Sequence, residues 1–238
     1  MSDVAPFRLN PDLDVAQLAR RFSERGRLQI ADFLAAGQAD ALRRELLERQ
    51  DWALILNAAD KVYDIPRSGW EQMTDDQRAK LDELVIRSAR SGFHYRYESI
   101  RVPDDDRSGS DLITQFVRFM ASTEATSFFR QVTALGDISF ADGQATAYSA
   151  GHFLTAHTDD VEGKNRRAAY VLGLSPVWQP EWGGLLMFHD ADDNIEEAFT
   201  PRMGALRIFS VPVRHSVSYV NPIAPEPRLS VTGWLRAE

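Results

Sequence analysis

From residue 144 onward, the chain consists of short apolar or alternating segments, and this pattern constrains the fold more than any other feature. Clusters of Gly, Pro, Asn and Asp separate the segments, and no long helical pattern interrupts them. A succession of short strands with turn signals between them is typical of a β-sandwich or a jelly roll. The expected strands cover residues 144–149, 152–159, 168–174, 184–188, 198–200, 205–209, 214–220 and 229–236.

The first 140 residues have a different, mainly helical pattern. Apolar residues at helical spacing follow Asn10-Pro11, a predicted helix start, and stop at Gly26. Thr74 and Gln77 form a capping-box pair that predicts the start of a later helix. Further helices are expected at 35–46, 111–120 and 123–135, with strands at 28–34, 52–56, 61–65 and 93–100. The sequence therefore predicts one α+β domain over residues 1–238, in which 1–140 are mainly helical support with some strands and 141–238 are the β core.

Charge and cysteine content exclude several classes of partner and site. The 27 Lys and Arg against 35 Asp and Glu give a net charge of -8, which argues against nucleic acid or an anionic membrane as the main partner. Because the chain has no cysteine, any metal must be held by His, Asp or Glu. The first residues lack the pattern of a secretory signal, and no apolar stretch is long enough to span a bilayer, so we expect a cytoplasmic location.

Two histidines and one aspartate are the candidate metal ligands. On an extended strand, side chains two positions apart face the same side, so His157 and Asp159 are expected to be neighbours. His215, in a later strand with apolar neighbours, is the candidate third ligand, and such a triad leaves open positions on iron. A buried, hydrogen-bonded structural histidine is the alternative for His215. The remaining histidines are expected to be structural or surface residues: His94, His152 and His189.

The last strand adds a candidate anion site. Alternation places Arg228, Ser230, Thr232 and Trp234 on one face of this strand, with aliphatic residues on the other. A polar face inside a barrel is costly unless something anionic meets it, and a guanidinium suits a carboxylate. A dicarboxylate such as 2-oxoglutarate fits, since one end could chelate a metal while the other reaches Arg228. The alternative is a solvent-facing edge strand with an ordinary surface arginine.

Together these residues resemble the iron(II)/2-oxoglutarate-dependent dioxygenases. The resemblance rests on His157-x-Asp159, the distant His215 and Arg228-x-Ser230, and it extends over about residues 27–236. The surrounding sequence is similar to the prolyl 4-hydroxylase branch, and most similar to the catalytic domain of ribosomal prolyl hydroxylases. The wider motifs are Tyr148 ahead of 151–157, Arg166-Arg167, Trp182-Gly-Gly-Leu, and the segment 228–234.

The resemblance implies a double-stranded β-helix (jelly roll) backed by N-terminal helices. It implies that His157, Asp159 and His215 bind Fe(2+) and act in catalysis. It also implies that Arg228 holds the distal carboxylate of the co-substrate 2-oxoglutarate, helped by Tyr148 and Ser230. Related enzymes often carry a second tyrosine at the position that Gly173 occupies here, so this chain departs from the pattern at that contact.

The activity implied is hydroxylation of a prolyl residue in a protein or peptide, with O2 consumed and succinate and CO2 released. A ribosomal protein is one candidate substrate, and no direct contact with nucleic acid or membrane is expected. Two alternatives stay open: a hydroxylase of free amino acids or other metabolites, and a cupin-like protein that binds metal without redox chemistry. Also open are the need for L-ascorbate, the oligomeric state, and whether residues 160–167 form a substrate-gating loop or a solvated connection.

Overall fold

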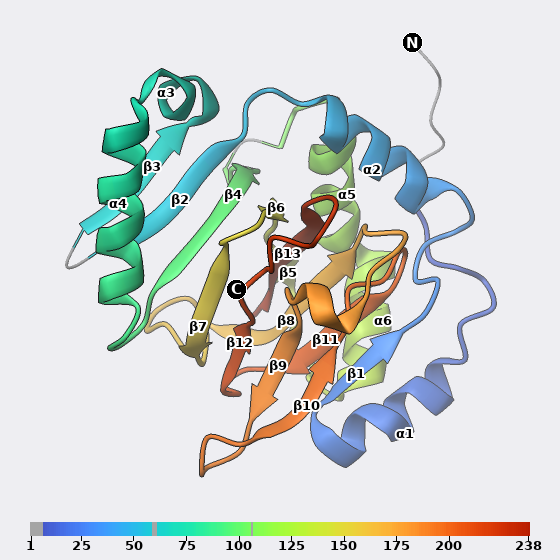
Figure 1. Cartoon of the computed structure of the whole chain (residues 1–238). Helices are drawn as coiled ribbons and strands as arrows, with labels where there is room; N and C mark the ends of the chain where they lie inside the picture. Colours follow the sequence, from blue (N-terminus) through green and yellow to red (C-terminus); the bar gives the residue numbers. More distant parts are fainter. Residues whose placement is uncertain (1–6, 59–60, 106) are drawn as a thin grey trace.

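The computed structural model describes residues 7–58, 61–105 and 107–238. Within these residues the strands form one 13-stranded antiparallel sheet that curls back on itself, as Figure 1 shows. The order along the main path is β1-β11-β8-β13-β6-β4-β7-β12-β9-β10. The chain therefore has the predicted α+β jelly roll.

The strands other than β5 overlap the predicted segments, with ends that shift by a few residues, whereas β5 was not predicted. In the C-terminal part the strands are β5 (Phe140–Ala141), β6 (Gln144–Tyr148), β7 (Phe153–His157), β8 (Arg166–Gly173), β9 (Leu186–His189), β10 (Ile195–Phe199), β11 (Leu206–Ser210), β12 (His215–Val217) and β13 (Arg228–Arg236). In the first half they are β1 (Arg27–Ile30), β2 (Ala53–Ala58), β3 (Lys61–Pro66) and β4 (Tyr95–Arg101).

The helices are α1 (Val15–Arg25), α2 (Gln38–Glu48), α3 (Arg67–Gln72), α4 (Asp75–Ser88), α5 (Leu112–Met120) and α6 (Thr123–Thr133), with a 3-10 turn at Pro180–Trp182. Four of the helices, α1, α4, α5 and α6, begin after a residue whose side chain caps them. The predicted capping box of Thr74 and Gln77 is confirmed at the start of α4. The predicted start at Pro11 is wrong, because Asp14 accepts a hydrogen bond from the Gln17 amide and begins α1 at Val15.

Two layers of the curled sheet enclose an interior that is separate from the helix-covered core. On β8, Ala169 and Val171 face the interior, where they pack with Phe188 of β9 and Phe209 of β11. The Phe188 and Phe209 rings meet edge to face, with centroids 5.1 Å apart. Because side chains alternate along a strand, the opposite face of β8 is free to pack against helices.

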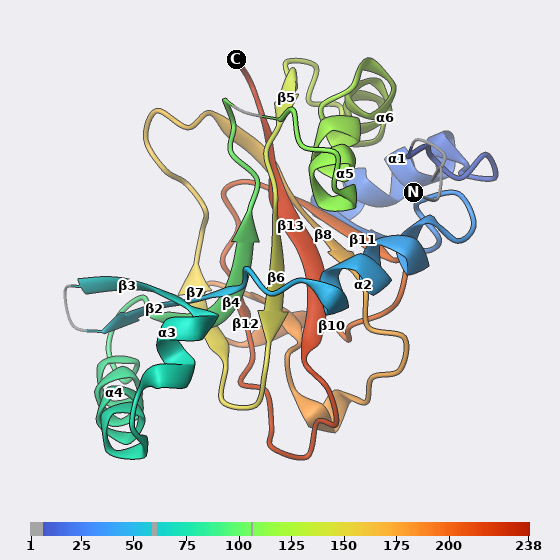
Figure 2. The same cartoon turned by 90° about the horizontal axis from the view of Figure 1, so that it is seen from above.

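Four helices cover that opposite face. Tyr170 and Leu172 of β8 belong to the large core that also contains Leu18, Leu42 and Phe116 of α1, α2 and α5. Figure 2 shows α1, α2, α5 and α6 on one side of the sheet, whereas α3 and α4 lie at the other end beside the β2–β3 hairpin. The helices therefore support the sheet from behind and leave its interior to the site. In the described residues no helix is long and apolar enough to cross a membrane.

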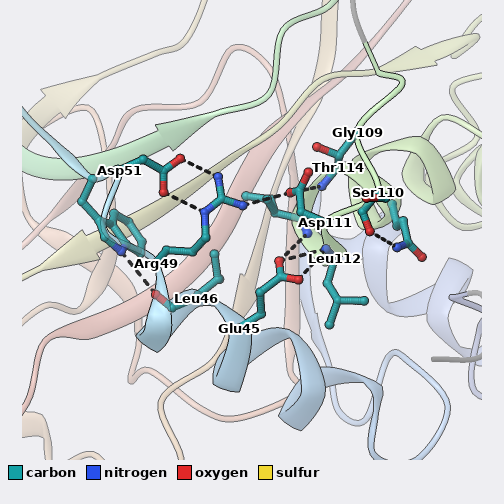
Figure 3. A network of polar contacts seen from close by, with 12 residues as sticks. Glu45, Leu46, Arg49, Asp51, Gly109, Ser110, Asp111, Leu112 and Thr114 are labelled. Carbon is teal, nitrogen blue, oxygen red and sulfur yellow. Dashed lines mark hydrogen bonds and ion pairs between the residues drawn. The ribbon is translucent and has the colours of Figure 1, made fainter. Parts of the chain in front are cut away.

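A network of polar contacts joins α2 to the start of α5 (Figure 3). Glu45 accepts hydrogen bonds from the backbone N–H groups of Leu112, at 2.8 Å, and Ile113, at 3.3 Å. Arg49, four residues on, pairs with Asp51 and with Asp111, which caps α5. Side-chain hydrogen bonding from Arg49 lowers the pKa of Asp51 below its ordinary value. This network fixes α2 against α5 behind the sheet.

We expect Glu45→Ala to lower the free energy of unfolding by about 1 kcal/mol, because two N–H groups at the α5 N-terminus lose their acceptor. Glu48→Ala is the matched control, since Glu48 is an exposed residue of the same helix. Urea unfolding of both variants measures the difference. Equal stability of the two variants would show that the carboxylate contributes nothing at this junction.

Candidate active site

A cavity of about 530 Å³ opens into the interior of the curled sheet. His157, Asp159 and His215 line it together with Arg228, so the residues predicted to bind metal and anion face one space. One ligand atom from each of the first three residues lies within 4.8 Å of the other two. Among the described residues, this is the group of His, Asp and Glu side chains close enough to hold an ion.

The three side chains converge through the aspartate. Nε2 of His157 lies 3.3 Å from Oδ1 of Asp159, and Nε2 of His215 lies 3.3 Å from Oδ2. The two imidazole rings are 4.2 Å apart between centroids. Both Nδ1 atoms face backbone carbonyls, of Thr155 at 3.0 Å and Val213 at 2.9 Å. These bonds orient the rings so that each presents Nε2 to the shared space.

Local irregularity in β7 places the triad, rather than regular alternation. His215 pairs with His157, but Val217 pairs with Leu154, so the register shifts between them. Leu154 and His157 consequently both line the cavity. Strand β7 ends at His157, and Asp159 lies beyond it with a φ of 62°. The predicted neighbours do meet, but the expectation that a regular strand 152–159 presents them on one face is wrong.

Asp159 is held as a carboxylate despite its burial. Burial alone raises its pKa, but the contacts with His157 and His215 hold the pKa well below the ordinary range of an aspartate. Arg166 of β8 adds a hydrogen bond of 3.1 Å from its Nη1 to the Asp159 backbone carbonyl. The guanidinium of Arg166 also stacks on Trp234, 3.5 Å from the ring centroid.

Arg228 lies at the inner end of the cavity with an unsatisfied donor. The residue is 4% exposed, and its Nη1 has no hydrogen-bond partner. Its guanidinium lies 5.1 Å from the ring centroid of Tyr148, its pairing partner on β6. Burial lowers the pKa of Arg228 and raises that of Tyr148, which keeps the phenol protonated. A buried cation with a free donor is a strong site for a carboxylate.

Ser230 is buried beside Thr146 rather than among the residues that line the cavity. Its side chain faces the interior, but the hydroxyl lies 2.9 Å from that of Thr146, and the residue is 1% exposed. The described lining of the cavity contains Thr146 and not Ser230. The Ser230 hydroxyl therefore orients Thr146, and its predicted contact with the co-substrate stays a prediction.

An aromatic row along one wall was not predicted from the sequence. Tyr148 stacks on Tyr97 with centroids 5.4 Å apart, and Tyr97 and Tyr95 follow at 5.7 Å. Phe93 continues the row and reaches the His157 ring at 4.9 Å. The alternation Phe93, Tyr95, Tyr97 was the signal in the sequence, because every second residue of a strand faces one side.

The other histidines lie elsewhere in the described structure. His152 accepts a hydrogen bond from the Ser149 amide, and burial lowers its pKa to about 4. Nε2 of His189 lies 2.7 Å from the Ser216 hydroxyl, and His94 is buried. None of the three lines the cavity among the residues described.

A comparison of the sequence with family profiles finds a match in the part of the chain that contains the site. A sequence profile described as the 2OG-Fe(II) oxygenase superfamily matches residues 143–236. The matched segment contains the triad and Arg228 in full. Residues 143–236 are thus similar in sequence to that superfamily.

Two curated relatives are similar in sequence to part of this chain. The mouse (Mus musculus) protein named prolyl 3-hydroxylase OGFOD1 is 28% identical over 153 residues, which are 60% of this chain and 27% of the relative. Its counterpart of the same name from Xenopus laevis is 38% identical over 100 residues, 39% of this chain and 19% of the relative. The similarity thus spans about a quarter or less of each relative's length.

Solved structures share the fold over nearly the whole chain. A Pseudomonas putida prolyl-4-hydroxylase has a TM-score of 0.60 and 22% identity, covering 94% of this chain and 99% of that one. A Trichoplax adhaerens prolyl hydroxylase, solved with a peptide fragment of the hypoxia inducible factor oxygen degradation domain, has a TM-score of 0.61 and 14% identity. That match covers 94% of this chain and 89% of the other.

The cavity has donors that fit both groups named in the description of the matched superfamily, Fe(II) and 2-oxoglutarate. Two imidazoles and a carboxylate form the donor set typical of non-haem Fe(II) with open positions. The partnerless Nη1 of Arg228 fits the far carboxylate of 2-oxoglutarate. The metal and the co-substrate are therefore compatible with the residues present.

We expect His157→Ala, Asp159→Ala and His215→Ala each to lose tight metal binding, because removal of one donor leaves two ligands. Binding of Mn²⁺ or Co²⁺ to the purified proteins, followed by calorimetry under exclusion of oxygen, measures the loss. His189→Ala is the control, since this imidazole lies outside the cavity lining. Unchanged affinity in any triad variant would remove that residue from the ligand set.

Proposed function

We propose that the chain is an Fe(II)- and 2-oxoglutarate-dependent dioxygenase that hydroxylates a prolyl residue of a protein or peptide. One observation carries the proposal: the His157–Asp159–His215 cluster and the buried, partnerless donor of Arg228 face the same cavity. A metal at one end and a cationic donor for a carboxylate at the other are what this co-substrate requires. The family match at residues 143–236 supports the same chemistry.

The residues proposed to bind the metal and the co-substrate each have a separate task. His157, Asp159 and His215 would hold Fe(II). When bound, Fe(II) with 2-oxoglutarate and O2 supplies the oxidation, in which the co-substrate gives succinate and CO2 and one oxygen atom enters a C–H bond of the substrate. Arg228 would orient the co-substrate by its far carboxylate, and the protonated Tyr148 beside it can donate a further hydrogen bond.

The walls of the cavity support an apolar ring as the group that is oxidised. Phe93, Tyr95 and Tyr97 form one wall, and Trp234 with Arg166 stacked on it forms another. Flat aromatic faces pack well against a small saturated ring, and they exclude water from the reacting carbon. The names of the relatives, both curated and structural, point to proline, and the Trichoplax protein was solved with a peptide.

The ring position that is hydroxylated and the source of the target proline are also part of this proposal. The curated relatives are named prolyl 3-hydroxylases and the Pseudomonas neighbour a prolyl-4-hydroxylase, so both ring positions are candidates. A ribosomal protein is the proposed source of the target proline, and the negative net charge of -8 suits a basic substrate. The cytoplasmic location, the use of L-ascorbate and the single domain over residues 1–238 stay predictions.

The decisive experiment is turnover with a mixture of proteome-derived peptides. Fe(II)-loaded protein is expected to convert 2-oxoglutarate to succinate faster with the peptides than without, and some proline-containing peptides gain the mass of one oxygen atom. Fragmentation of those peptides locates the modified residue, and NMR assigns the ring carbon. A parallel reaction contains free amino acids in place of the peptides. Oxidation of free amino acids alone would instead favour a metabolite hydroxylase, and absence of succinate would favour a non-redox metal-binding protein.

We expect Arg228→Met to raise the KM for 2-oxoglutarate about 10- to 100-fold, since a charge-assisted hydrogen bond in a buried site is lost. Metal affinity is expected to stay close to that of the unmodified protein, because Arg228 is not one of the ligands. Steady-state succinate formation gives the KM, and calorimetry gives the metal affinity. An unchanged KM would show that the far carboxylate binds elsewhere.

A further inference from the structure

A second buried arginine, Arg207, faces the interior of the sheet. On β11, Leu206 and Ile208 belong to the helix-covered core, whereas Phe209 belongs to the interior cluster. Because side chains alternate along a strand, Arg207 shares the interior face with Phe209. The residue is only 2% exposed. An arginine at this depth needs a counter-charge or a full set of hydrogen bonds.

Arg207 has neither within the described parts of the chain. No carboxylate there forms an ion pair with it, one nitrogen donates to the Thr200 carbonyl, and its Nε has no partner. Its charged neighbours are also cations. Burial, together with Arg228 and Arg202, lowers the pKa of Arg207 to about 9, so the guanidinium is still charged at neutral pH. This buried charge is uncompensated.

The guanidinium of Arg207 fills the space that Gly173 leaves open because it has no side chain. A Cβ built on Gly173 would lie 2.5 Å from Nη1 of Arg207, so the guanidinium occupies the space into which a side chain at 173 would point. Gly173 pairs with Ser230 on β13, two residues from Arg228. Arg207 therefore extends from β11 past β8 toward the strand that carries Arg228.

We propose that Arg207, which is not among the described residues that line the cavity, adds a second positive charge behind Arg228, so that the inner end of the cavity is built to attract a carboxylate. The inference rests on the proposed function, because the anion is the far carboxylate of 2-oxoglutarate. Two buried cations with unsatisfied donors repel each other until an anion joins them. Arg207 thereby favours 2-oxo acids that carry a second carboxylate over those that lack one.

Binding to Mn²⁺-loaded protein without oxygen tests this separately from turnover. The probes are 2-oxoglutarate, and oxalate, which can chelate the metal but lacks a far carboxylate. We expect Arg207→Met to weaken binding of 2-oxoglutarate about tenfold or more, with oxalate binding changed much less. Arg207→Lys, which keeps the charge, is expected to restore most of the affinity. Arg202→Met is the matched control, because Arg202 is a nearby exposed arginine.

Thermal unfolding of the ligand-free proteins separates this role from a structural one. Since Arg207 is an unpaired buried charge, Arg207→Met is expected to be at least as stable as the unmodified protein. Arg207→Gln, which removes the charge but keeps a donor for the Thr200 carbonyl, provides the same comparison if Arg207→Met does not fold.

The outcomes distinguish the inference from the function on which it rests. Equal weakening for 2-oxoglutarate and oxalate, or unchanged binding of both in the charge-free variants, would overturn the role of Arg207 alone. If the unmodified protein bound oxalate but not 2-oxoglutarate, the proposed function would fail together with the inference. Selective loss for 2-oxoglutarate that Arg207→Lys reverses supports both.

Discussion

The buried carboxylate of Asp159 between two imidazoles is the interaction on which the site depends. Each Nε2 lies 3.3 Å from one of its oxygens, and the two rings come from strands that are distant in the sequence. Three polar groups that face one another in an apolar interior need a common partner to offset the loss of water. The curled sheet brings them together, and the helices behind it keep the curl fixed.

The cavity is electrically divided along its length. Its metal end holds the anionic Asp159 and two imidazoles, while the cation Arg228 lies at its inner end, with no paired carboxylate among the described residues. A molecule with a metal-chelating head and an anionic tail can bind in only one orientation. The charges of the protein therefore determine which end of the co-substrate meets the metal.

Much of this was accessible from the sequence because it follows from alternation and residue type. The strands from residue 144 onward and the interior face of Arg228 needed only the two-residue period of a strand, and the candidate triad followed from residue type. The register shift in β7 was not accessible, since it arises from pairing with β12, and nothing in the local sequence marked the positive φ of Asp159. Arg207 was missed for a related reason. In the sequence of residues 206–210, Arg207 is a single charged residue in a mostly apolar strand. Only the packing of β8 beside Gly173 shows that the fold buries this charge.

The position of β13 in the sheet has a consequence for where Arg228 can lie. This strand carries Arg228 near one end and Trp234 near the other, and it is hydrogen-bonded to β6 on one side and β8 on the other. Strands paired in this way cannot slide past one another, so Arg228 keeps a fixed place relative to His157 and His215 on the paired strands β7 and β12. The co-substrate therefore meets a template that is set before it binds.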